Sequence, residues 1–193
     1  MIIKDCILTD RLILRSFVCG DEEDVLALMS DDYICRMAGI RPFKTIGEVK
    51  KFMNIWADGA YAITERSDDR VIGVVQTPIF PWDGRAEIGY WLAEDCRGRG
   101  YMTEAVEAVK DFLFRTWWWC DELWIHVFVG NEASRNVALK CGFHPMYESY
   151  KDSVYSPYGR VESEESFVMT RGEYEWERRG MPFFTTDPLI RAA

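Results

Sequence analysis

Apolar patterns typical of strands and of helices alternate along this chain. Residues 7–16 (ILTDRLILRS) read as a strand. Asp21 then precedes a helical set of apolar residues at 25–29, which predicts a helix with that aspartate as its N-cap. Thr45 and Glu48 form a capping-box pattern ahead of apolar residues spaced i, i+3, i+4 and i+7, which predicts a second helix.

The middle of the chain predicts a hairpin and a third strand. Residues 60–66 and 71–79 are rich in strand-forming residues and are joined by a polar turn. Residues 85–92 (RAEIGYWL) follow as a third strand, in which Glu87 and Tyr90 lie on opposite faces because side chains alternate. This strand leads directly into a glycine-rich loop.

The second half of the chain continues the mixture of helices and strands. Apolar residues keep helical spacing after Gly100 and predict a helix of about three turns. Residues 122–129 (ELWIHVFV) predict a strand, and residues 131–141 predict a short helix that Gly142 closes. Two more strands are predicted near residues 143–150 and 164–170. The order of these elements is that of an α/β or α+β domain.

The length of 193 residues favours one compact domain. We assign that domain to residues 1–172 and treat residues 173–193 as a C-terminal tail. Trp176, Phe183 and Phe184 predict that the tail docks, either on the same domain or on a partner subunit.

Charge and apolar content restrict the partners of the chain. Lys and Arg number 23 against 32 Asp and Glu, and the net charge of −9 opposes the phosphate neutralisation that nucleic-acid binding requires. No window approaches the ~18 apolar residues of a membrane span, and Asp5 and Asp10 lie where a signal peptide would be apolar. We therefore expect a cytoplasmic protein without nucleic-acid or membrane partners.

Cysteine and histidine usage argues against a structural metal. The six cysteines lie far apart, without a Cys-x-x-Cys pair. Only two histidines, His126 and His144, are present to complete a metal site. We therefore expect reduced, mostly buried thiols and no metal.

The loop that follows residues 85–92 has the features of an anion site. Gly98 and Gly100 let the backbone approach a ligand closely, and Arg97 and Arg99 can add charge-assisted hydrogen bonds. The helix N-terminus behind them offers unpaired N–H groups at the positive end of the helix dipole, which suits a diphosphate. A plain turn between strand and helix is the alternative. The loop lacks the Lys-Ser/Thr of a P-loop and the third glycine of a dinucleotide-binding fingerprint.

Two segments resemble motifs of the GCN5-related N-acetyltransferases. EIGYWLAEDCRGRGYMTEA resembles motif A, in which Arg97–Met102 occupy the pattern Gln/Arg-x-x-Gly-x-Gly/Ala. Met102 departs from the glycine or alanine that is usual at the last position. Residues 131–143 (NEASRNVALKCGF) resemble motif B. TDRLILR, EIGYW, and N-x-x-S ahead of K-x-G-F are similar to the branch that contains the ribosomal-protein-alanine N-acetyltransferases, and the resemblance covers residues 7–171.

The resemblance implies a fold and a co-substrate. The fold is a mixed, twisted sheet of about seven strands with helices on both faces, and the sheet splays open beside the glycine loop. The co-substrate is acetyl-CoA, with its diphosphate on the loop and its pantetheine arm in the split, where strand edges bond it. The residues implied in coenzyme binding are Trp91, Leu92, Arg97, Gly98, Arg99, Gly100, Tyr101, Met102 and Asn131.

Aminolysis of a thioester needs a neutral amine, whereas a thiolate of pKa ~8.5 leaves nearly unaided. Glu87 is the candidate base, because it is a charge in an apolar run and begins a strand that resembles the substrate-side strand of the family. A surface carboxylate is the alternative for this residue. Ser134 is the candidate acid, because the position at which many relatives carry a tyrosine is Ala138 here. A helix cap is the alternative for Ser134.

Aromatic residues suggest further contacts. His126 either lines the substrate pocket with Trp124 and Phe128 or is a packed, hydrogen-bonded histidine. Tyr150 flanks a polar loop and is a second candidate for the acceptor pocket. Trp117–Trp119 cannot all face inward from one helix, so we expect one ring at a subunit interface, in the acceptor pocket or under a loop, with a homodimer as the favoured cover.

The sequence leaves the amine acceptor open. We expect direct acetyl transfer to a peptide or protein N-terminus, because an α-amine of pKa ~7.8 is about one-seventh neutral at pH 7, while a lysine-like amine of pKa ~10.4 is neutral in about one molecule in 2,500. A small-molecule amine, such as a polyamine, an amino acid or an aminoglycoside, is the first alternative. A non-catalytic acyl-CoA-binding sensor is the second.

Overall fold

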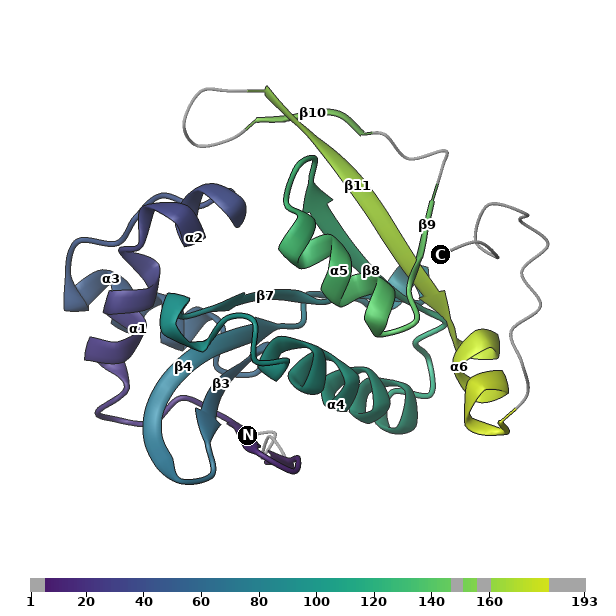
Figure 1. Cartoon of the computed structure of the whole chain (residues 1–193), viewed down its shortest axis with the longest axis horizontal. Coiled ribbons are helices and arrows are strands. Elements are labelled where there is room, and N and C mark those ends of the chain that lie inside the picture. Colours follow the sequence, from purple (N-terminus) through teal and green to yellow (C-terminus); the bar gives the residue numbers. More distant parts are fainter. Residues whose placement is uncertain (1–5, 147–150, 156–160, 181–193) are drawn as a thin grey trace.

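The structure of the protein is a computed structural model that describes residues 6–146, 151–155 and 161–180. Its strands form two sheets with helices packed around them (Figure 1). The first sheet is antiparallel and has the order β1 (Ile7–Leu8), β2 (Leu12–Arg15), β3 (Ala60–Glu65), β4 (Asp68–Gln76) and β7 (Gly89–Leu92). The second has the order β10 (Lys151–Tyr155), β11 (Val161–Thr170), β8 (Glu122–Phe128), β6 (Arg85–Glu87) and β5 (Ile79–Phe80), with β9 (His144–Pro145) also paired to β11. The helices are α1 (Glu22–Met29), α2 (Asp32–Met37), α3 (Ile46–Ile55), α4 (Tyr101–Thr116), α5 (Glu132–Lys140) and α6 (Arg171–Arg178).

The two sheets separate within the segment 85–92, which the sequence predicts as a single strand. β6 runs parallel to β8, and the N–H of Ile88 still donates to the carbonyl of Trp124 in β8 (2.8 Å). From Gly89 onward the chain pairs with β4 instead. This exchange of partners produces the splayed arrangement that the resemblance implies, and the mixed fold is confirmed.

The first sheet is covered by helices on both faces. In β3, Tyr61 and Ile63 pack in the hydrophobic cluster under α4, while Ala60 and Ala62 pack in the cluster formed with α1 and α3. Every residue of β3 before Glu65 is buried, as expected for a strand between two layers of helices. The helices on both faces that the sequence predicts are therefore present.

Several elements differ from the sequence prediction. Residues 7–16 form two strands instead of one, because the hydroxyl of Thr9 accepts a hydrogen bond from the N–H of Leu12 (2.9 Å) and closes a turn. The helix after Gly100 has 16 residues and is longer than three turns. α2 has no counterpart in the prediction, and the described residues contain eleven strands instead of about seven. Of the strand expected at 143–150, only β9 falls within the described residues.

The predicted helix caps agree with the structure in part. Thr45 and Glu48 form the expected capping box at α3. Asp21 stands at the N-cap of α1, but its carboxylate forms two hydrogen bonds with Arg15 (2.8 and 2.9 Å) and does not cap the helix. The prediction of a capping side chain was therefore wrong for Asp21.

The three consecutive tryptophans do not lie on a helix, because α4 ends at Thr116. Trp117 and Trp119 stack with ring centroids 5.3 Å apart, while Trp118 is 85% exposed. The premise that one helix carries all three rings was wrong, although one ring does lie outside the core.

α6 crosses the domain boundary that we drew at residue 172. Tyr174 of this helix stacks on Phe114 of α4 with ring centroids 4.8 Å apart. Arg171 donates to the carbonyls of Phe114, Trp117 and Cys120, which ties the start of α6 to the end of α4. Docking of the tail beyond Gly180 stays a prediction, because Phe183 and Phe184 lie outside the described residues.

Cysteine placement is mostly internal. Cys35, Cys96, Cys120 and Cys141 are buried free thiols, and Cys6 and Cys19 are exposed. Burial raises the pKa of the Cys35 and Cys120 thiols to about 11. In the part of the chain that the structure describes, no helix combines the length and apolar character that a membrane crossing needs. The cytoplasmic location stays a prediction.

Candidate functional site

The glycine loop presents the N-terminus of α4 to the solvent side of the fold. Gly98 and Gly100 have φ angles of +73° and +79°, the left-handed region that favours glycine. Gly100 is the N-cap of α4, so the N–H groups of the next three residues have no acceptor within the helix. A Cβ added to Gly98 would meet no atom within 4 Å. The loop therefore leaves open space in front of a helix N-terminus, as an anion site requires.

An ion-pair network holds this loop in place. The Glu104 carboxylate in the first turn of α4 accepts hydrogen bonds from the backbone N–H and Nε of Arg11 (2.9 and 2.6 Å) and from the hydroxyl of Thr9 (2.5 Å). These bonds keep the pKa of Glu104 below its usual value, in spite of the desolvation that acts in the opposite direction. Arg11 Nη1 also donates to the carbonyl of Arg99 (2.9 Å). The turn between β1 and β2 therefore fixes both the glycine loop and the start of α4.

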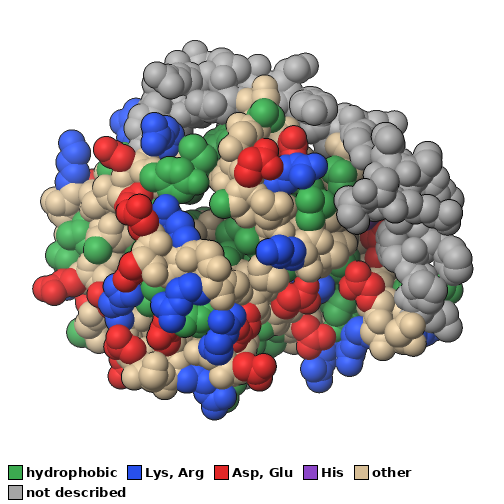
Figure 2. All heavy atoms as spheres, in the orientation of Figure 1, with side chains coloured by type: hydrophobic (Ala, Val, Ile, Leu, Met, Phe, Trp, Pro, Cys, Tyr) green, Lys and Arg blue, Asp and Glu red, His purple; other side chains and the backbone are tan. Residues whose placement is uncertain are grey.

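A cavity of about 420 Å³ lies beside the loop. It extends between α2, β7, α5 and the end of β8, and Figure 2 shows the surface hollowed between α2 and α5. Its size falls within the range of small-molecule sites. The predicted site residues that line it are Glu87, Trp91, Leu92, Arg97, Gly98, Gly100, Tyr101, Met102, His126, Asn131 and Ser134. Nearly the whole predicted constellation therefore surrounds one space.

Among the predicted residues that the structure describes, Arg99 does not line this cavity. The Arg99 side chain forms an ion pair with Glu65 (3.3 Å) and donates to the hydroxyl of Tyr101 (2.6 Å), so its charge is engaged outside the cavity. Tyr150 lies outside the described residues.

Arg97 and Trp91 each place a buried donor in the cavity wall. Arg97 Nε donates to the carbonyl of Leu92 (3.1 Å), and its guanidinium stacks over the ring of Tyr33 in α2. Within the described residues, neither Arg97 Nη2 nor the indole Nε1 of Trp91 has a hydrogen-bond partner. Buried donors without partners are uncommon, so these two groups suit a ligand that supplies acceptors.

The edge of β7 that faces the cavity presents the expected backbone groups of Leu92, but those of Tyr90 in place of those expected from Trp91. The Trp91 carbonyl points toward β4, because a Cβ added to Gly73 of β4 would lie only 2.7 Å from the Trp91 oxygen. The N–H of Ala93 points the same way and donates to the carbonyl of Ile72. Because backbone groups alternate along a strand, those of Tyr90 and Leu92 point to the opposite edge. The backbone edge groups therefore come from Tyr90 and Leu92, and Trp91 contributes its indole.

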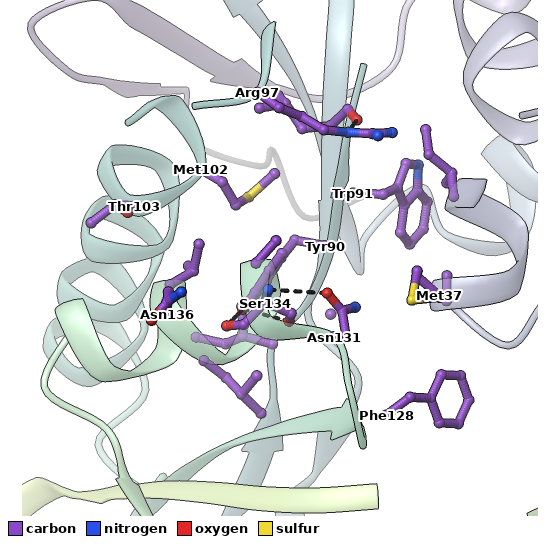
Figure 3. A pocket seen from close by; sticks show the side chains of 18 of the residues that line it. Met37, Tyr90, Trp91, Arg97, Met102, Thr103, Phe128, Asn131, Ser134 and Asn136 are labelled. Atoms are coloured by element: carbon purple, nitrogen blue, oxygen red, sulfur yellow. Dashed lines mark hydrogen bonds between the residues drawn. The ribbon is translucent and has the colours of Figure 1, made fainter. Parts of the chain in front are cut away.

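Met102 does not obstruct the loop. Its side chain is 7% exposed, belongs to the cluster under α4 and extends from α4 toward β7 (Figure 3). At the position usually held by glycine or alanine, the side chain of Met102 therefore packs in the core. The N–H of Met102 is one of the N-terminal N–H groups of α4.

The start of α5 carries Asn131 and Ser134 into the cavity (Figure 3). Asn131 is the N-cap, and its Oδ1 accepts a hydrogen bond from the N–H of Ser134 (3.2 Å). The Ser134 hydroxyl does not cap the helix but donates to the hydroxyl of Tyr90 (3.0 Å). Tyr90 in turn donates to the carbonyl of Ser134 (3.0 Å), and desolvation of its phenol raises the Tyr90 pKa well above the usual value.

Glu87 and His126 line the part of the cavity that lies along β6 and β8. Glu87 ends β6 directly before the sheets part, opposite Trp124 in the parallel register. His126 Nδ1 lies 2.9 Å from the hydroxyl of Ser166, and its ring stacks on Trp124 with centroids 6.0 Å apart. His126 is thus both packed and part of the cavity wall, so the two interpretations of this residue are compatible.

Sequence reasoning missed three residues of the site. Tyr90 belongs to the predicted strand, but its contact with Ser134 joins residues 44 positions apart, and no local pattern reveals such a contact. Tyr33 and Met37 line the cavity from α2, a six-residue helix that is too short for a periodic signal.

Comparisons with known proteins identify similar sequences and similar folds. The sequence model of the family described as acetyltransferase (GNAT) domain matches residues 11–144. The uncharacterized N-acetyltransferase YoaA of Bacillus subtilis (strain 168) is 28% identical over 166 residues, which cover 77% of this chain and 93% of YoaA. A spermidine N-acetyltransferase from Vibrio cholerae, solved in complex with CoA and spermine, has a TM-score of 0.75 at 19% identity, covering 86% of this chain and 99% of that one. RimL, a ribosomal L7/L12 alpha-N-protein acetyltransferase solved with coenzyme A, has a TM-score of 0.73 at 21% identity, covering 86% of this chain and 98% of that one.

Proposed function

The chain belongs to the GNAT family of acetyltransferases and is an acetyl-CoA-dependent N-acetyltransferase, and from this premise we propose that it acetylates the α-amino group of a peptide or protein N-terminus by direct transfer in a ternary complex. The observation that carries the proposal is the single cavity that joins the glycine loop to Glu87, His126 and Ser134. A coenzyme held at one end and an amine at the other can meet there without a covalent enzyme intermediate.

The residues of the cavity fit acetyl-CoA, which supplies the activated acetyl group. The backbone N–H groups from Gly98 to Met102 bind the diphosphate at the N-terminus of α4. The backbone of Tyr90 and the N–H of Leu92 bond the pantetheine amides. Arg97 Nη2 and Trp91 Nε1, which have no hydrogen-bond partner among the described residues, add contacts nearby. This assignment supports an acyl group placed between β7 and α5.

Glu87 and Ser134 serve the two halves of the reaction. Glu87 removes one proton from the incoming ammonium, so that the neutral nitrogen can form its bond to the acetyl carbon. Once that bond has formed, the nitrogen releases a second proton to solvent and the neutral amide results. Ser134 donates a hydrogen bond to the sulfur as the carbon–sulfur bond breaks. Because a hydroxyl holds its proton more tightly than a thiol of pKa ~8.5, the sulfur finally takes its proton from solvent.

The choice of an α-amine rests on the acidity of the ammonium that the base must deprotonate. An ammonium of pKa ~7.8 releases its proton more easily than one of pKa ~10.4, so the demand on the base is smaller. A polyamine is the second candidate, because Glu87 and Glu164 both line the cavity and the net charge of the chain is −9. The structural neighbour that carries spermine in its complex adds support to this alternative.

We also propose that the chain forms a homodimer. Trp82 and Trp118 are 97% and 85% exposed, and β5 carries the exposed side chains of Ile79 and Phe80 at the edge of the second sheet. Large apolar side chains at such levels of exposure support a protein interface.

An acceptor panel tests the proposed activity. Purified protein is assayed for thiol release from acetyl-CoA with unblocked peptides, the same peptides with a blocked N-terminus and a free lysine, and a polyamine. We expect activity that disappears when the N-terminus is blocked. Activity on the polyamine alone would favour the second candidate, and coenzyme binding without turnover on any amine would favour a sensor.

A further inference from the structure

We infer that Tyr90 is a positioning residue for the Ser134 hydroxyl, and that the two hydroxyl groups act on the departing sulfur as one unit. The inference rests on the proposed function, in which Ser134 bonds to that sulfur. Tyr90 lies seven positions before Arg97, where the pattern of the glycine loop begins. Neither that pattern nor the alternation of the strand assigns a role to Tyr90.

The contact joins a strand of the first sheet to a helix. Tyr90 lies on β7, and Ser134 lies in the first turn of α5 (Figure 3). The phenol oxygen of Tyr90 is 3.0 Å from the Ser134 hydroxyl and 3.0 Å from the Ser134 carbonyl. Both residues line the cavity. The two hydroxyl groups therefore stand where the proposed acyl group would lose its sulfur.

These distances allow two arrangements of the hydroxyl hydrogens. In the first, Ser134 donates to Tyr90 and Tyr90 donates to the Ser134 carbonyl. In the second, Tyr90 donates to the Ser134 oxygen, and the serine hydrogen points into the cavity. A hydroxyl can both donate and accept, so neither arrangement requires movement of a heavy atom.

Negative charge on the sulfur favours the second arrangement. Both arrangements contain two hydrogen bonds. The first has two neutral bonds, whereas the second keeps one neutral bond, from Tyr90 to the Ser134 hydroxyl, and replaces the other by a bond from Ser134 to a charged acceptor, which is the stronger kind. Desolvation raises the pKa of Tyr90, so the phenol keeps its hydrogen and remains a donor throughout. No net proton transfer occurs within the pair.

The surroundings of α5 explain why the phenol comes from a strand. Asn131, Ser134 and Ala138 lie on one face of the helix, and Ala138 is 0% exposed. The position at which many relatives carry a tyrosine is thus a small, buried side chain in this protein. Tyr90 brings a phenol to the same face of α5 from β7. That phenol lies next to Ser134 and not next to Ala138, which is one turn further along the helix.

Removal of one oxygen atom tests this role. Tyr90→Phe keeps the ring, and we expect kcat to fall by about threefold to tenfold, the range for loss of one neutral hydrogen bond, with the Kd for acetyl-CoA and the KM for the amine unchanged. Tyr61→Phe is the matched control, because Tyr61 is also a buried tyrosine of the first sheet but does not line the cavity. Thermal melting of both variants verifies that they fold.

A double-mutant cycle separates positioning from a purely structural role. If Tyr90 acts through the Ser134 hydroxyl, Tyr90→Phe has no further effect on kcat in a Ser134→Ala background. If Tyr90 only anchors α5 through the Ser134 carbonyl, its removal costs as much in that background as in the wild type, because the carbonyl remains. The inference about Tyr90 would be wrong if the two substitutions lowered kcat independently, so that their fold-changes multiply in the double variant. It would also be wrong if Tyr90→Phe kept the wild-type kcat while Ser134→Ala lowered it. Either result would leave the proposed role of Ser134 intact. Wild-type kcat in Ser134→Ala would overturn the proposed role of Ser134 as well.

Discussion

Substitution of Gly98 by alanine tests whether the glycine loop binds the coenzyme. The φ angle of Gly98 is +73°, and a residue with a Cβ loses about 1–2 kcal/mol in the left-handed region. The added Cβ meets no protein atom within 4 Å, so it causes no clash in the free protein. It does project from a residue that lines the cavity, where it would separate the backbone from a bound diphosphate.

The two effects can be measured separately. The backbone cost lowers the free energy of unfolding, whereas loss of a charge-assisted hydrogen bond to a phosphate oxygen lowers the affinity by about 1.5–3 kcal/mol. That loss corresponds to a Kd for acetyl-CoA at least about tenfold higher. Calorimetric titration gives the Kd, and thermal unfolding gives the stability of the same sample.

Gly180→Ala is the matched control for this experiment. Gly180 also has a positive φ, +67°, and also offers open space to a Cβ, but it follows α6 and does not line the cavity. We expect both variants to lose stability and only Gly98→Ala to lose affinity. An unchanged Kd in a folded Gly98→Ala variant would show that the diphosphate binds elsewhere.

Three further predictions follow from the site and the surface. Glu87→Gln should lower kcat/KM by about 10²-fold near neutral pH, and the loss of kcat/KM should shrink as rising pH deprotonates the amine in solution. A pH–rate profile identical to that of the wild type would exclude Glu87 as the base. Asn131→Ala should lower the free energy of unfolding by ~1 kcal/mol, because α5 loses its N-cap, while Asn131→Asp should keep the wild-type stability in thermal melts. Equal melting temperatures for the wild type and both variants would contradict a stabilising cap at Asn131. Trp118→Ser should shift a dimer toward monomer in sedimentation, and a wild-type protein that is monomeric at high concentration would refute the interface.

The parts of the fold that depend on short stretches of sequence were predictable. The order of strand, glycine loop and helix follows from alternation in residues 85–92, two glycines, and helical spacing after Gly100. The capping box at Thr45 and Glu48 likewise needs only four consecutive residues. Helix boundaries were less certain, as the end of α4 at Thr116 demonstrates, because three tryptophans carry no strong stop signal.

The division of the strand at Ile88 was not predictable, because alternation is the same on both sides of it. Residues 85–87 and 89–92 each keep a period of two, and only the identity of the partner strand changes, from β8 to β4. Partner choice is decided by packing against distant residues, which single-sequence periodicity does not report.

The same division explains how the two halves of the proposed chemistry come together. In a continuous strand, Glu87 and Tyr90 would face opposite sides of one sheet and could not line a common space. Because the chain leaves β8 after Ile88 and joins β4 from Gly89, the sheet opens between them, and both side chains line the same cavity. Tyr90 can then reach Ser134 on α5, while Glu87 and His126 line the part of the cavity that we propose for the acceptor. The opening that we propose for the coenzyme is therefore also the feature that places a carboxylate and a pair of hydroxyl groups around one cavity.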